Sequence, residues 1–444
     1  MRSAIVVAVA ALVAGASARA QAEAPASDRR PIVGYVMRGD TKVTDETGEF
    51  LSRTFMGDEV GPRDLRRLER AFVSSELFEK VTVTLEAAPG GYIVVATVKD
   101  KHSWIIAPTV FALPNRKSFG VGFVENNFRG KNQKLLLYGQ AGDREDLLFA
   151  VWLIPSIAGT PLTFRADTFN YRRQVQEYLN DPDAPDSDVV ARETETTYFG
   201  GGILVGWRAA WWLNIDTRLR FGKVSFRDAR DGEDPEVALP LPQTDGWDVS
   251  AQGRITMDAR QFRFGVNWGP YLQLSLDTTI PGLDDYDYSI ALLRLWYSWV
   301  FRGEHQLELR TSGQLGRHLP FHEELGLGGA SDLRGYAVDR YRGDTRAFFR
   351  AEYSVPVAKW KLFAFRAIGF WDSGYLGWNF ARDTGDRAYL PTQGNGVSVF
   401  RNDVGAGLRV YIKRAVLPLL GFDVAYGFEG KALELYFALG LTDF

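Results

Sequence analysis

Residues 211–226 read WWLNIDTRLRFGKVSF, and from Asn214 to Phe221 this stretch alternates between polar and apolar side chains. Successive side chains of a β-strand point to opposite faces, so the alternation separates two surfaces. One surface carries Ile215, Thr217, Leu219 and Phe221, and the other carries Asn214, Asp216, Arg218 and Arg220. An apolar outside and a charged inside are typical of a transmembrane β-barrel with a water-filled lumen, and they are the inverse of a soluble β-sandwich.

About 16 alternating runs of this kind follow one another from about Ser103 onward, which predicts an all-β transmembrane barrel of about 16 antiparallel strands over residues 101–444. Short and long connections take turns between the runs, as they do in outer-membrane barrels, where the periplasmic turns are short. The short connections lie near Gly130, Gly159, Ala210, Arg260, Gly303, Ala358 and Ala415. A soluble sandwich has no reason to sort its loops in this way. The asymmetry therefore predicts a barrel in the bacterial outer membrane, with the N-terminal part of the chain in the periplasm.

The composition and the N-terminus agree with an exported protein. The 444 residues carry a formal net charge of -3, which argues against a protein that coats nucleic acid, and they include no cysteine. Residues 1–20 combine Arg2, a short apolar run and the small-residue ending Ala18-Arg-Ala20, which predicts a secretory signal peptide. The apolar run is far shorter than the roughly 20 residues of a membrane-spanning helix.

Residues 30–100 have a different pattern, which predicts a small α+β domain of order β-α-α-β-β. Gly61 and Pro62 mark the start of its second helix, and Leu65, Leu68 and Phe72 form an apolar stripe along it. Two alternating strands follow, joined through Pro89 and two glycines. The segment contains no nucleophile motif, metal cluster or phosphate-binding loop, so we interpret it as a docking module.

Residues 325–344, LGLGGASDLRGYAVDRYRGD, match neither a helix nor a strand, because they are rich in glycine and their apolar residues do not alternate. The stretch lies in a long connection, residues 318–344, between two alternating runs. It includes the motif Leu333-Arg334-Gly335-Tyr336. Gly328, Gly329 and Gly335 allow tight turns in such a loop.

Taken together, these features resemble the BamA/TamA family of outer-membrane assembly and translocation barrels. The resemblance rests on the small N-terminal domain, the barrel, the LRGY loop motif, the run FWDSG at residues 370–374 and the aromatic C-terminus. It implies that residues 30–100 form one POTRA-like domain, fewer than the best-known assembly factors carry. It further implies that Phe437, Gly440 and Phe444 act as a C-terminal strand signal.

The resemblance also implies that the long loop folds back into the lumen, where its arginine meets acidic residues of the barrel wall. Strand parity supplies two such carboxylates: Asp372 alternates with Trp371, and Glu352 alternates with Tyr353, so both acidic side chains point inward. Arg334 can bind either carboxylate through two parallel hydrogen bonds. The alternative is that these residues are ordinary solvated charges of the barrel wall.

Enzymatic chemistry is not indicated, and the sequence calls for no cofactor. His318, His322, Glu323 and Glu324 resemble a metal-binding group, but Pro320 prevents a regular helix from aligning the two histidines, and we place them at the external mouth without a metal. The aromatic residues are better explained as girdles at the two membrane interfaces than as base-stacking platforms, so no nucleic acid is expected.

The sequence thus predicts an outer-membrane insertase or translocase with a lateral seam and a gated lumen. Its expected partners are outer-membrane lipid and lipopolysaccharide, unfolded outer-membrane or secreted polypeptides, and a periplasmic protein or lipoprotein at the POTRA-like domain. The alternative function is a passive pore without assembly activity.

Overall fold

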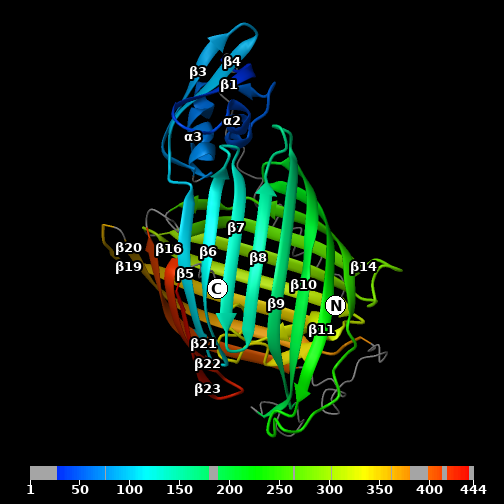
Figure 1. The fold of residues 1–444 in the computed structure, drawn as a ribbon. Coiled ribbons are helices and arrows are strands. Elements are labelled where there is room, and N and C mark those ends of the chain that lie inside the picture. The colour runs from blue at the N-terminus through cyan, green and yellow to red at the C-terminus, as the bar shows by residue number, and fades with distance from the viewer. Residues whose placement is uncertain are drawn as a thin grey trace, which may run out of the picture.

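The computed structural model describes residues 28–75, 77–179, 189–263, 266–301, 303–361, 363–380, 399–412 and 418–439. The predicted signal peptide, residues 1–20, lies outside these ranges, as do Gly440 and Phe444. Two bodies are visible: a small α+β domain and a large closed barrel (Figure 1).

The N-terminal domain is a four-stranded sheet of order β2-β1-β4-β3 with helices packed on it. Its elements are β1 (Arg30–Asp40), α2 (Asp45–Ser52), β2 (Glu59–Val60), the 3-10 turn η1 (Pro62–Asp64), α3 (Leu65–Val73), β3 (Phe78–Ala88) and β4 (Gly91–Asp100). The expected order β-α-α-β-β is present, and the short β2 is an addition. Gly61 N–H donates to the Asp64 carboxylate at 3.1 Å at the start of the second helical segment. Leu68 and Phe72 of α3 are fully buried against the sheet, so the domain has a core of its own.

The barrel closes through antiparallel pairing of sixteen long strands among the described residues, which confirms the predicted fold class. The strands of its first half are β5 (Trp104–Leu113), β6 (Arg116–Phe128), β7 (Gln133–Gly142), β8 (Glu145–Ile154), β9 (Leu162–Tyr178), β10 (Val190–Ala210), β11 (Leu213–Arg230) and β12 (Gly246–Asp258). The second half contains β14 (Val266–Thr279), β15 (Ser289–Phe301), β16 (His305–Arg317), β19 (Thr345–Lys359), β20 (Phe363–Gly377), β21 (Val399–Ile412), β22 (Pro418–Gly427) and β23 (Ala432–Leu439). The short β13 (Gln261–Arg263) extends the β12–β14 hairpin.

The side chains of β11 divide between the two faces as the sequence predicts. Phe221 is 46% exposed on the outside, whereas Asp216 is buried in the lumen and accepts hydrogen bonds from Arg254 of β12 at 2.8 and 3.0 Å. Charged pairs of this kind line the interior, and apolar side chains cover the exterior. None of the described helices is both long and apolar enough to cross a bilayer.

The N-terminal domain lies at the end of the barrel that carries the short turns (Figure 1). The Arg208 guanidinium, at the end of β10, lies 3.8 Å from the centroid of the Phe50 ring of α2. Arg53, directly after α2, lies over the Trp211 ring of the β10–β11 turn at 5.4 Å. The domain thus contacts the rim of the barrel through cation–π pairs.

The barrel closes where β23 meets β5. Described pairs are Phe437 with Ala112, Ala438 with Phe111, and Leu439 with Val110. Pro108 pairs with Val121 of β6, and it has no N–H to offer to β23.

Candidate functional site: the lumen loop and its anchors

The loop between β16 and β19 folds into the barrel and forms its own hairpin. It contains the 3-10 turn η2 (Phe321–Glu323) and two short paired strands, β17 (Leu325–Leu327) and β18 (Tyr341–Gly343). Gly328 and Gly329 have φ of 120° and 104°, a region that favours glycine because it lacks a Cβ. Apolar loop residues, including Leu327 and Leu333, are fully buried against the inner wall.

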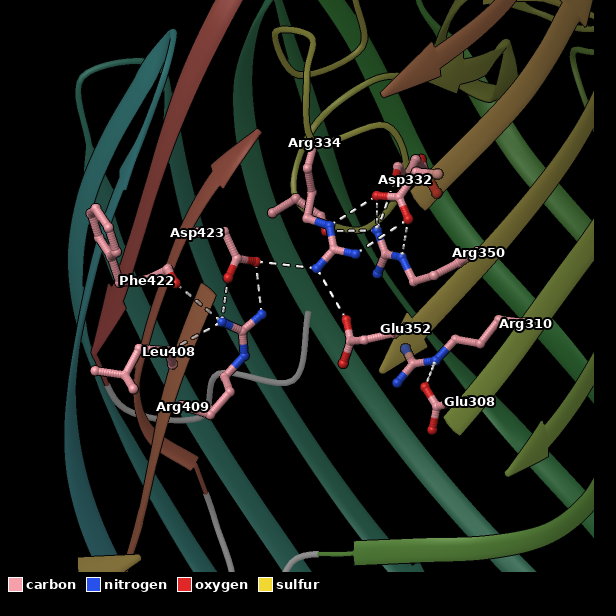
Figure 2. Close-up of polar contacts among 12 residues, drawn as sticks. Glu308, Arg310, Asp332, Arg334, Arg350, Glu352, Leu408, Arg409, Phe422 and Asp423 are labelled. Atoms are coloured by element: carbon pink, nitrogen blue, oxygen red, sulfur yellow. Dashed lines mark hydrogen bonds and ion pairs between the residues drawn. The ribbon is translucent and has the colours of Figure 1, made fainter. Parts of the chain in front are cut away.

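Arg334 is completely buried and lies among three carboxylates of the barrel wall (Figure 2). Its Nε donates to Asp372 Oδ2 at 2.8 Å and its Nη2 donates to Asp372 Oδ1 at 3.2 Å, the two-bond geometry that a guanidinium favours. Its Nη1 donates to Glu352 at 3.1 Å and to Asp423 at 3.2 Å. One loop side chain therefore ties together β19, β20 and β22.

Charge explains why this arginine stays ionised in a buried position. Burial alone would lower the pKa of the Arg334 guanidinium, but the carboxylates of Asp372 and Glu352 outweigh burial and raise that pKa above its ordinary value. The guanidinium also lies over the Phe370 ring, 3.2 Å from its centroid. Removing Arg334 would leave the buried carboxylates around it with less positive charge to balance their own negative charge.

The wall carboxylates have further cationic partners, which the sequence analysis did not identify. Arg350 donates to both oxygens of Asp372 at 2.7 and 3.0 Å and to the Asp332 carbonyl at 2.7 Å. Arg409 of β21 donates to Asp423 at 2.7 Å (Figure 2). The site is thus a network of alternating charges rather than a single pair.

Asp423 could have been found from the sequence by the parity argument that identified Asp372. It alternates with Phe422 and Tyr426, which are exposed on the outside, while Asp423 itself is buried. Which inward carboxylate reaches the loop depends on the stagger of the strands, and that stagger is not visible in local sequence.

The residues after Arg334 fix the loop tip to the last strands before the seam. Gly335 N–H donates to Asp403 at 2.9 Å, and a Cβ at Gly335 would come within 2.6 Å of the Gly427 nitrogen. Tyr336 Oη donates to Glu429 at 2.5 Å, and Tyr436 Oη donates to the Tyr336 carbonyl at 2.7 Å. Glycine at 335 is therefore required by close packing against β22.

A second anchor holds the base of the loop on the opposite wall. His322 of η2 is buried, and its Nε2 lies 3.2 Å from Asp248 Oδ2 of β12. Tyr198 and Tyr288 also donate to the Asp248 carboxylate, at 2.5 and 2.9 Å. Asp248 lies near the start of β12, at the barrel end opposite the N-terminal domain, so His322 lies at the external mouth as expected, with its ring turned inward onto a buried carboxylate.

Asp248, His322 and Glu323 offer ligand atoms within 4.8 Å of one another, a spacing that a metal ion could use. However, the Arg220 guanidinium lies 2.9 Å from Glu323 and 3.2 Å from Asp248, where it already supplies positive charge. Burial raises the pKa of the Glu323 carboxyl, and Arg220 opposes that shift. We therefore assign this cluster to anchoring the loop.

The remaining sequence-predicted residues belong to the C-terminal strand. Phe437 of β23 pairs with Phe422 on one side and with Ala112 of β5 on the other, so it lies at the closure of the barrel. The other two residues of the expected strand signal, Gly440 and Phe444, are not among the described residues.

The family model described as the Omp85 superfamily domain matches residues 127–442, which is most of the chain. The chain belongs to the Omp85 superfamily. This membership confirms the resemblance to the BamA/TamA family and makes the chain an outer-membrane β-barrel.

Solved structures of Omp85-like architecture resemble this Omp85 protein in fold. BamA from Haemophilus ducreyi lacking POTRA domains 1-3 matches 91% of this chain and 83% of its own, with a TM-score of 0.58 and 14% identity. CdiB from Acinetobacter baumannii matches 92% of this chain and 74% of its own, with a TM-score of 0.61 and 13% identity. CdiB from Escherichia coli matches 95% of this chain and 93% of its own, with a TM-score of 0.54 and 10% identity. At such identities the likeness is one of fold.

Proposed function

We propose that this Omp85 protein is an insertase or translocase without enzymatic activity. It assists the insertion of β-barrel proteins into the outer membrane, or the passage of a polypeptide across it, through the seam between β5 and β23 and a lumen gated by the loop. The N-terminal domain acts as a POTRA-like module in the periplasm and receives unfolded clients or a protein partner.

The buried Arg334 is the observation that carries this proposal. A passive pore gains nothing from a loop that fills the lumen, whereas a gate needs an element that is held in place by contacts that can be exchanged. Arg334 and Tyr336 tie the loop to β19–β22, beside the β22–β23 hairpin at the seam. Movement of the loop would therefore change the contacts of β22, which is the neighbour of the closing strand β23.

The N-terminal domain also supports the proposed insertase or translocase function, because it lies at the barrel entrance that a client from the periplasm would use. Its contacts with the rim include cation–π pairs such as that of Arg208 with Phe50. Contacts of this kind allow relative movement of two domains without unfolding either one.

Reconstitution into liposomes tests the proposal. A urea-denatured eight-stranded outer-membrane protein serves as the client, and its protease-protected, heat-modifiable form is measured over time. We expect faster insertion with the protein than in protein-free liposomes. A steady ionic current in planar bilayers together with no acceleration of client insertion would instead identify a passive channel.

A further inference from the structure

We propose that the outer wall of the barrel carries a binding groove for an acylated glycolipid of the outer leaflet, formed by strands β6 to β10. The groove has a volume of about 680 Å³ and begins at β6, the neighbour of the seam strand β5. It runs from an apolar slot to a cluster of polar and charged side chains, which is the layout of an amphiphile-binding site.

The slot exists because β7 presents small residues to the lipid side. Register places Gly139 between Val121 of β6 and Leu148 of β8, and places Ala141 beside Phe119. Phe119, Val121 and Leu148 are 68%, 53% and 64% exposed, so they stand out as two ridges. A Cβ added at Gly139 would meet only Leu148, at 3.9 Å, so the floor between the ridges is open. An acyl chain fits this apolar trough.

Polar groups without protein partners mark the next part of the groove. The Asn170 amide faces outward in the same row as Leu148, and the Thr197 hydroxyl follows on β10. Neither side chain has a hydrogen-bond partner among the residues that the structure describes. Thr168, which also points outward, differs because its hydroxyl donates to the Gly200 carbonyl at 2.9 Å. An unpaired amide facing lipid is costly, and ester or amide carbonyls at the top of an acyl chain would satisfy it.

The charged end of the groove indicates the head group. Arg172 donates to Asp146 at 2.8 and 2.5 Å and to Glu195 at 3.2 Å, so two carboxylates share one guanidinium. The carboxylates can accept hydrogen bonds from the hydroxyl groups of a sugar, and the guanidinium can donate to its oxygen atoms. Side chains of Asp146 and Arg172 remain 41% and 42% exposed, so a sugar can reach them.

The position of the groove selects the leaflet. Its charged end lies next to the β7–β8 connection, at the end of the barrel opposite the N-terminal domain (Figure 1). Assignment of that end to the outer leaflet rests on the periplasmic location of the domain under the proposed function. Glycolipids with several ester- and amide-linked acyl chains combine the required chain, carbonyls and hydroxyls.

Native mass spectrometry of the full-length protein in detergent tests the proposal, with purified lipid A, phosphatidylethanolamine and phosphatidylglycerol as separate probes. We expect the protein to retain lipid A in preference to both phospholipids. Gly139→Leu should reduce that retention about tenfold, corresponding to about 1.4 kcal/mol, because the leucine fills the slot. Asn170→Leu should reduce it as well, since the carbonyl-binding amide is lost.

Gly253→Leu provides a matched control on β12. Gly253 also faces outward, and a Cβ there would meet nothing within 4 Å, but it lies outside the groove. Heat-modifiable migration confirms that each variant is folded. Two results would overturn the assignment. One is equal retention of lipid A by the Gly139 and Gly253 variants, and the other is equal retention of lipid A and either phospholipid by the unmodified protein. The readout is lipid retention rather than client insertion, so its failure would leave the proposed function standing.

Discussion

At the scale of single residues, Arg334 is held by more partners than a simple ion pair. Sequence parity pointed to Asp372 and Glu352, and the structure places both within 3.2 Å of the guanidinium. It adds Asp423, and it shows that Arg350 shares Asp372. Removal of Arg334 and removal of Asp372 therefore have different consequences, because Asp372 also neutralises Arg350.

We expect Arg334→Ala to weaken the attachment of the loop by about 3–5 kcal/mol, since it leaves buried carboxylates without their partner. The barrel ladder should stay closed, while limited proteolysis from outside should cut the loop near Tyr336. Asp372→Ala should weaken the attachment of the loop further, because both Arg334 and Arg350 lose the carboxylate that they share. Arg254→Ala removes a lumen ion pair with Asp216 and serves as the control. Equal protease resistance of Arg334→Ala and the control would contradict this account of the anchor.

The second anchor makes a separate prediction. His322→Phe keeps a ring beside Tyr286, whose centroid lies 4.9 Å from the imidazole, but it removes the contact with Asp248. We expect a loss of about 1–3 kcal/mol, seen as faster hydrogen exchange over residues 319–327, because the buried Asp248 keeps only its tyrosine and arginine partners. Unchanged exchange would show that apolar packing alone holds this end of the loop.

At the scale of elements, the alternation in β11 was enough to predict which side chains face the lumen. The contact between η2 and β12 was beyond such reasoning, because His322 and Asp248 are 74 positions apart and belong to different elements. Local periodicity reports the face of a strand, but not the stagger that decides which residues of two elements meet. The glycines of the loop hairpin were visible in sequence, whereas the close contact of Gly335 with β22 was not.

Gly335 provides a test at this scale. Gly335→Ala would bring a Cβ within 2.6 Å of a backbone nitrogen and 2.7 Å of a backbone carbon of Gly427, so we expect the loop tip to move away from β22. Gly369→Ala on β20 is the control, because a Cβ there meets nothing within 4 Å. A single cysteine at Tyr336 should react faster with an external thiol reagent in the Gly335 variant. Equal reaction rates in both variants would count against the tight packing.

At the scale of the whole molecule, the N-terminal domain and the barrel have separate cores. Residues 28–101 contain the buried cluster around Leu68 and Phe72, and no barrel residue belongs to it. We expect this fragment to fold alone, with a cooperative thermal transition and dispersed amide resonances. Poorly dispersed resonances would mean that contacts with the barrel, such as Arg208 on Phe50, are needed for its stability.

Cross-linking of the seam tests the central claim, which is that β5 and β23 separate while a client passes. The chain has no cysteine, so Phe111→Cys with Ala438→Cys introduces the only thiols, at positions that pair across the seam. Ala150→Cys with Thr168→Cys places the same pair between β8 and β9 as the control. In the liposome assay, the oxidised seam pair should insert client no faster than protein-free liposomes, reduction should restore the rate, and the oxidised control should remain active. An oxidised seam pair that inserts client as fast as its reduced form would contradict lateral opening.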